Sequence, residues 1–141
     1  MKFKNALIYG PEFKFIKGGF EVTNGRFNNV LYENSDEALD LKEAMIIPGL
    51  IDIHNHGNSG FDFSDGDLNG LRTMAAYLAK HGITSFAPAS MTLPEKELTK
   101  AFKTAAAFSK ERSFGTSVLR GINMEGPFFS EAKKGAQNSS H

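Results

Sequence analysis

The segment IIPGLIDIHNHG, residues 46–57, decides the fold expected for this chain. The part from 46 to 54 is largely apolar, and such a run predicts a parallel-sheet strand that is buried on both faces. The run ends at His54, and His56 follows two positions later. Side chains two positions apart on a strand point to the same face, so both imidazoles can enter one space.

Two helices are predicted after this strand. The first has apolar residues three and four positions apart, Asp65 or Asp67 can cap its start, and Gly82 can end it. The second follows a capping-box pattern, in which Thr92 precedes Glu95 by three positions. The predicted apolar faces are Leu68, Leu71, Ala75, Leu78 and Ala79 in the first helix, and Leu98, Ala101, Phe102, Ala105 and Phe108 in the second.

Two further strands accompany these helices, ITSFAPA at 83–89 and SVLRGINME at 117–125. The order strand, helix, strand, helix, strand predicts an α/β fold with parallel strands and right-handed crossovers. Parallel strands end on the same side of a sheet. The histidine pair, Thr92 and Glu125 should therefore lie at one edge, where ligands bind in β/α barrels and open α/β sheets.

The N-terminal part of the chain has a different pattern, with short strands broken by turns. Asn24 and Gly25 form a two-residue hairpin signal between FEVT and FNNVLYE, the latter at 27–33. The sequence therefore predicts a small β-rich domain over residues 1–47 and an α/β domain over residues 48–141.

The predicted edge can hold a metal ion. The chain has no cysteine, so a metal must use His, Asp, Glu or water. Two neutral imidazoles make half of a zinc or iron site, which a carboxylate such as Glu125 can complete. The alternatives are hydrogen-bonded structural histidines, and a Glu125 that caps a loop or pairs with Lys133 or Lys134. Thr92 is better explained as a helix cap than as a catalytic hydroxyl.

Composition limits the classes of function. The 141 residues are 40% apolar with a formal net charge of zero, so a packed core is feasible. A nucleic-acid binder that relies on electrostatics is not expected, because it needs a basic excess. Neither an apolar run long enough to span a membrane nor the apolar region of a signal peptide is present. These features predict a cytoplasmic protein without nucleic-acid or membrane partners.

The motifs IIPGLIDIHNHG, GITSFAPASMT, GINMEGPFFS and KKGAQN occur in the order and approximate spacing seen in N-acetylglucosamine-6-phosphate deacetylases. These enzymes belong to the metal-dependent amidohydrolase superfamily. The chain resembles them along its whole length, and EGPF followed by KGAQN is the most specific part. The resemblance implies a TIM-type (β/α)8 barrel beside a small β-sandwich-like domain. It also implies hydrolysis of the acetamide of N-acetylglucosamine 6-phosphate to glucosamine 6-phosphate and acetate.

The resemblance also implies roles for particular residues. Glu125 matches the family's metal-ligand glutamate, and His54 and His56 match the superfamily's His-X-His pair. Ala136 and Gln137 match a two-residue substrate contact, in which many relatives have histidine where Gln137 stands. The implied cofactor is a divalent metal, zinc or iron, and the implied partners are a small amino-sugar phosphate and, in the intact enzyme, a second copy in a homodimer.

The length of the chain departs from the family. A (β/α)8 barrel needs roughly 250 residues, whereas residues 48–141 suffice for its first three βα units at about 30 residues per unit. The family's catalytic aspartate is expected beyond His141, so no catalytic residue is assigned within the chain. The expectation is a truncated, incomplete barrel that is inactive by itself.

Two other functions remain open. Other amidohydrolases, such as cyclic amidases or dihydroorotase-like enzymes, share the first motif but do not usually contain EGPF followed by KGAQN. The alternative from another class is a non-catalytic, truncated fragment. Its unclosed strands would expose edges and apolar faces, and such a fragment is expected to self-associate.

Overall fold

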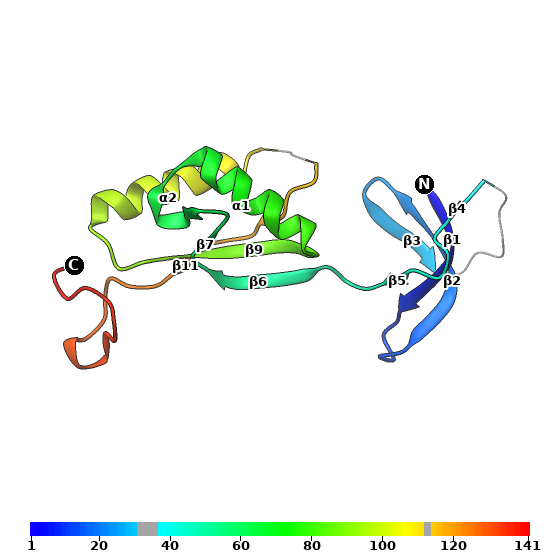
Figure 1. Cartoon of the computed structure of the whole chain (residues 1–141), viewed down its shortest axis with the longest axis horizontal. Coiled ribbons are helices and arrows are strands. Elements are labelled where there is room, and N and C mark those ends of the chain that lie inside the picture. Colours follow the sequence, from blue (N-terminus) through cyan, green and yellow to red (C-terminus); the bar gives the residue numbers. More distant parts are fainter. Residues whose placement is uncertain (31–36, 112–113) are drawn as a thin grey trace. The chain divides into compact units, whose positions relative to one another are not determined.

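The computed structural model describes residues 1–30, 37–111 and 114–141. The chain divides into two compact units, Met1–Pro48 and Gly49–His141. Each unit has its own sheet (Figure 1). None of the helices in the described ranges is both long enough and apolar enough to cross a bilayer.

The first unit is built on β1 (Lys2–Tyr9), β2 (Phe15–Thr23) and β3 (Arg26–Val30), which form an antiparallel meander. Asn24 and Gly25 have φ values of 53° and 71°, and this left-handed pair makes the tight turn between β2 and β3. The predicted hairpin is thus confirmed, although residues 31–33 of its second strand lie outside the described residues.

Two short strands complete this sheet. The strands β4 (Leu39–Asp40) and β5 (Met45–Ile46) both pair in parallel with β1. The described residues of the unit form one sheet, and a second, facing sheet is not found among them. The sandwich-like arrangement that the resemblance implied is therefore not seen there. Instead, a small aromatic cluster is centred on Phe20, whose ring lies 4.7 Å from that of Phe3 and 5.2 Å from that of Phe27.

The second unit contains the predicted parallel sheet. The strand β9 (Ile83–Ser90) lies in its middle and pairs with β6 (Leu50–Asn55) along one edge. Along the other edge it pairs with β10 (Val118–Leu119) and then β11 (Asn123–Met124). The third predicted strand is therefore interrupted, although the N–H of Arg120 still donates to the carbonyl of Phe86. All pairings are parallel, and the described strands form an open sheet, not a closed barrel.

Two helices, α1 (Leu68–Lys80) and α2 (Glu95–Phe108), lie on one side of this sheet (Figure 1). Their apolar faces pack with Phe86 of β9 into the core, much as the spacing predicted. Asp67 caps α1 by accepting from the N–H groups of Asn69 and Gly70, which confirms one of the two predicted caps. The buried core consists of Phe63, Leu71, Met74, Ala75, Leu78, Phe86, Ala101, Ala105 and Phe108.

The predicted capping box at Thr92 is wrong. Helix α2 has Pro94 as its N-cap, and no side chain of the described residues caps it. Because Pro94 occupies the cap position, Thr92 lies two residues too early to reach the first turn of the helix. Its side chain is buried instead, and its hydroxyl has no hydrogen-bond partner among the described residues.

Short elements connect β6 to α1. The strands β7 (Gly57–Asn58) and β8 (Phe61–Asp62) form a tight hairpin, followed by the 3-10 helix η1 (Phe63–Asp65). A second 3-10 helix, η2 (Glu131–Lys133), lies near the C-terminal end of the described chain.

The expectation of one strand over 46–54, buried on both faces, is also wrong. The run is divided between the two units, and its second half forms β6. Leu50, Ile51 and Ile53 of β6 are 55%, 68% and 69% exposed. β6 pairs only with β9, so no described strand covers its outer edge. The apolar run predicted the strand correctly, but the burial of a strand depends on which other elements pack against it, and the local sequence does not specify these.

Candidate metal centre

The two histidines occupy the carboxyl end of β6. His54 is in the strand and His56 follows directly after it. Asp52 fixes the backbone there, since its carboxylate accepts from the N–H of His54 at 3.1 Å and from the side-chain amide of Asn55 at 3.1 Å. The rings lie 5.1 Å apart at 81°, and their Nε2 atoms are separated by 3.3 Å. As predicted, both side chains point into one space.

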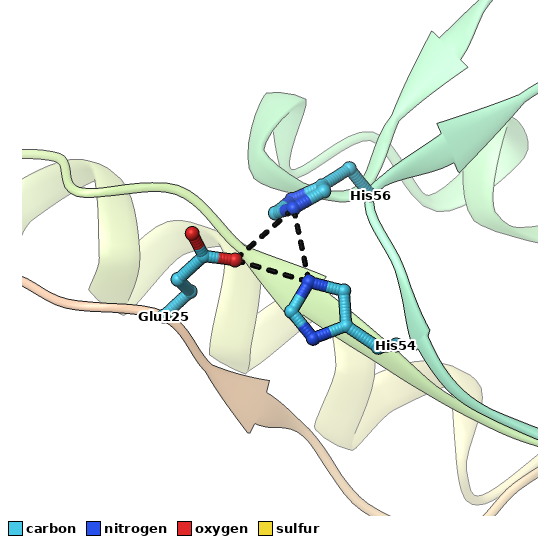
Figure 2. A group of neighbouring side chains, drawn as sticks. All are labelled: His54, His56 and Glu125. Carbon is cyan, nitrogen blue, oxygen red and sulfur yellow. Dashed lines mark hydrogen bonds and ion pairs between the residues drawn. The ribbon is translucent and has the colours of Figure 1, made fainter. Parts of the chain in front are cut away.

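Glu125 reaches the same space from the other edge of the sheet. It directly follows β11, which pairs with β9 on the side opposite to β6. Its Oε2 atom lies 3.0 Å from Nε2 of His54 and 3.2 Å from Nε2 of His56 (Figure 2). The side chain is 27% exposed. Because three parallel strands end on one side, residues about 70 positions apart in sequence meet here.

Glu125 pairs with neither of the two lysines considered as its alternative partners in the sequence. Lys134 instead lies 4.0 Å from Glu131 and donates to the backbone carbonyl of Gln137. The second carboxylate oxygen of Glu125, Oε1, accepts from the side-chain amide of Gln137 at 2.6 Å. One oxygen thus faces the histidines and the other faces Gln137.

The spacing of the three donor atoms fits a metal ion. Two imidazole nitrogens about 2.0–2.1 Å from a tetrahedral zinc ion are separated by about 3.3 Å, and a carboxylate oxygen lies about 2.9–3.4 Å from each for bond angles between octahedral and tetrahedral. The observed separations of 3.3, 3.0 and 3.2 Å fall within these values. His54, His56 and Glu125 form the one group of candidate ligands found among the described residues. Three protein ligands leave a coordination position for water, as in catalytic zinc sites.

The other ring nitrogens bear on which tautomer is present. Ligation through Nε2 leaves the ring hydrogen on Nδ1, which usually donates to a second residue. Nδ1 of His56 is buried and has no hydrogen-bond partner in the described part of the chain. Nδ1 of His54 lies 3.1 Å from the side-chain nitrogen of Asn123, which also donates to the carbonyl of Ile53 at 2.9 Å. If the side-chain amide of Asn123 were reversed, its oxygen could accept the Nδ1–H of His54, but its hydrogen bond to the carbonyl of Ile53 would be lost.

Sequence reasoning missed two features of this site. Asn123 was not singled out, although it is a polar residue in the otherwise apolar strand end before Glu125. The side chain of Gln137 was expected to contact substrate, and its contacts with Glu125 and with the backbone N–H of Thr92 were not foreseen. Ala136 is exposed beside it. The substrate role of both residues stays a prediction.

Comparison with known proteins identifies relatives of this chain. No protein-family model matches the chain. The N-acetylglucosamine-6-phosphate deacetylase of Vibrio furnissii is 36% identical over 100 residues, which make up 71% of this chain and 25% of that protein. The deacetylase of Bacillus subtilis (strain 168) is 31% identical over 134 residues, covering 89% of this chain and 34% of the relative.

A solved structure agrees with these relatives. The crystal structure of N-acetylglucosamine-6-phosphate deacetylase from Pasteurella multocida matches 99% of this chain with a TM-score of 0.86 and 25% identity, over 37% of its own length. The chain thus spans well under half the length of the proteins that it matches. It is a homologue of the N-terminal portion of N-acetylglucosamine-6-phosphate deacetylases.

Proposed function

We propose that this chain supplies the metal ligands of a deacetylase that hydrolyses the acetamide of N-acetylglucosamine 6-phosphate. The convergence of His54, His56 and Glu125 carries the proposal, because their donor atoms have the spacing that zinc or iron requires. The names of the similar enzymes supply the substrate. A homodimer remains the assembly that the resemblance implies for the intact enzyme.

The chemistry needs an electrophile to be strengthened and a nucleophile to be made. An amide resists water because its carbonyl is resonance-stabilised and its amine leaves poorly. A bound divalent metal supplies Lewis acidity, which makes water nucleophilic near neutral pH and polarises the carbonyl. In this proposal the two Nε2 atoms and Oε2 of Glu125 hold that ion, and the carboxylate offsets part of its charge.

Proton transfer requires a group outside the cluster. A general base must take a proton from water, and a general acid must deliver one to the leaving nitrogen. Glu125 is the one carboxylate in the cluster; its Oε2 faces the histidines and its Oε1 accepts from Gln137. Neither oxygen is placed to take that proton. We therefore expect residues 1–141 to bind metal without hydrolysing the amide at an enzymatic rate.

Ala136 and Gln137 are the proposed substrate contacts. Ala136 is exposed and Gln137 is half-buried at the edge of the metal centre. A primary amide carries two N–H donors, and Glu125 accepts from the Gln137 nitrogen. The second donor of Gln137 is therefore the group proposed to bind a sugar oxygen.

Metal binding by the 141-residue chain tests the ligand set. Titration with Co²⁺, followed by visible absorption, should show one bound equivalent in the wild type. His54→Ala, His56→Ala and Glu125→Gln should each weaken binding strongly. His81→Ala is the matched control, because that imidazole contacts the carbonyl of Tyr77 on α1. A wild type that binds no Co²⁺, or an equal loss in the control, would contradict the proposal.

A chimera tests the reaction. In it, this chain replaces the matching third of the Bacillus subtilis relative. The chimera should release acetate from N-acetylglucosamine 6-phosphate, and Glu125→Gln should abolish that release. The isolated chain should release none above background. A chimera that binds metal but does not deacetylate this sugar phosphate would exclude the proposed substrate, and turnover by the isolated chain would exclude the need for a further proton-transfer group.

A further inference from the structure

The side-chain amide of Gln137 connects the proposed metal ligand to the central strand. Its nitrogen donates to Oε1 of Glu125 at 2.6 Å, and its oxygen accepts the backbone N–H of Thr92 at 3.2 Å. Thr92 is 5% exposed and lies just after β9. Gln137 thus anchors the carboxylate to a buried part of the fold.

The direction of the amide follows from these partners. A backbone N–H can only donate, so the Gln137 oxygen must face Thr92, and the NH₂ group must then face Glu125. This orientation suits an ionised carboxylate, which only accepts. Glutamate at this position would face Glu125 with a second carboxylate, and a shorter side chain would not span both partners.

Hydrogen bonds to Lys134 fix the backbone of Gln137. The N–H of Gln137 donates to the carbonyl of Lys134 at 3.0 Å, and its own carbonyl accepts from the Lys134 ammonium at 3.2 Å. Both ends of the residue are therefore fixed, and the amide is preorganised before any ligand arrives.

We infer that Gln137 is a positioning residue, which holds Glu125 so that one oxygen, Oε2, is offered to the metal. This inference rests on the proposed function. The terminal torsion of a glutamate is broad, so an unrestrained carboxylate would lose entropy on binding and could present either oxygen or both. With Oε1 engaged by Gln137, only Oε2 points at Nε2 of His54 and His56.

Co²⁺ titration of the 141-residue chain tests this role. Gln137→Met keeps the length of the side chain and removes both hydrogen bonds. It should lower Co²⁺ affinity about 10–100-fold, the usual cost of losing a residue that orients a ligand, and should change the visible spectrum of bound Co²⁺ as the carboxylate coordination changes. A lower metal-free unfolding midpoint with unchanged Co²⁺ affinity and spectrum would show that the role of Gln137 is purely structural, because the variant also leaves the buried N–H of Thr92 without its acceptor.

Asn138→Ala is the matched control, since the Asn138 side chain contacts only Ser140 among the described hydrogen bonds. It should leave affinity and spectrum unchanged. Should Gln137→Met fail to fold, Gln137→Asn keeps the amide but withdraws it by one methylene, and it carries the same expectation. Wild-type affinity and spectrum in the Gln137 variant would overturn the inference alone, whereas a wild type that binds no Co²⁺ would overturn the proposed metal site as well.

Discussion

The neighbouring strands β6 and β9 run in the same direction and end on the same side of the sheet, but their surroundings differ. Both are parallel, both follow a glycine, and both end at the candidate metal centre. β9 has strands on both edges and contributes Phe86, which is fully buried, to the core under α1 and α2. Of the described strands only β9 pairs with β6, and the apolar residues Leu50, Ile51 and Ile53 of β6 are exposed.

The difference shows that polar contacts can hold one end of a strand in place while the apolar side chains along the rest of the strand stay exposed to solvent. The polar end of β6 makes its contacts within the chain, through Asp52, His54 and His56. These polar contacts need only a few groups at the right distance and angle. The apolar side chains of β6 are stabilised only when a large surface area is removed from water, and the described neighbours bury little of that area.

The largest expected effect comes from the buried strand. Phe86→Ala removes a fully buried ring from the core and should lower the free energy of unfolding by about 3–5 kcal/mol. Chemical denaturation followed by circular dichroism measures it. Phe128→Ala is the matched control at an aromatic residue that is 89% exposed, where a change within about 0.5 kcal/mol is expected. Equal losses in both variants would mean that β9 is no better packed than the surface.

A smaller effect is expected at Gly126, where the chain leaves β11 beside the candidate metal centre. Gly126 has a φ of 79°, and a side chain there would meet the hydroxyl of Thr92. Gly126→Ala should cost about 1–2 kcal/mol for the left-handed backbone alone, and it should weaken Co²⁺ binding by displacing Glu125. Gly121→Ala, whose added carbon would meet no atom within 4 Å, is the control. Unchanged Co²⁺ affinity in Gly126→Ala would show that the Glu125 backbone tolerates movement.

The exposed strand should respond differently. Replacing Ile51 and Ile53 by Thr keeps β-branched side chains and should change the stability of the monomer by no more than about 0.5 kcal/mol per site. It should, however, reduce self-association, which we expect of the wild type because β6 exposes an apolar face and an unpaired edge. Sedimentation velocity compares the two proteins. A monomeric wild type would remove the basis for self-association.

The smallest effect is expected at an ion pair between the helices that cover β9. Arg72 of α1 lies 2.5 Å from Glu111, which follows α2. Hydrogen bonding to Arg72 lowers the pKa of the Glu111 carboxyl below its ordinary value of 4.5. A lowered pKa stabilises the folded state above the ordinary value, and the contribution disappears as the pH falls through the folded pKa.

Unfolding of the wild type and of Glu111→Gln at several pH values tests this pair. The difference in stability should be small and constant at neutral pH, because the pair is exposed to solvent. It should begin to shrink as the pH approaches 4.5 and should disappear only once the pH lies below the lowered pKa of the folded protein. A difference that instead grows on acidification would mean that the carboxyl pKa is raised, and not lowered, in the folded protein.

Much of the second unit was predictable because its signals are local. Apolar residues three and four positions apart predicted both helices and their buried faces. Asp65 or Asp67 was predicted to cap α1, and Asp67 does so. The three metal-ligand candidates could be named because strand ends in a parallel sheet share a side. The capping box failed at Thr92 because Pro94 took the cap position, a competition between two local signals that the pattern alone does not rank.

The amino-acid sequence by itself determined the order of strands and helices, the parallel sheet and the identity of the donors at its edge. These features follow from the periodicity of apolar residues and from the direction of the chain, and both can be read from short stretches of the sequence. Only the tertiary structure decided that β6 is exposed, that Glu125 turns one oxygen to the histidines, and that Gln137 takes the other. Such features depend on which atoms come within a few ångströms after folding, and distant residues bring those atoms there.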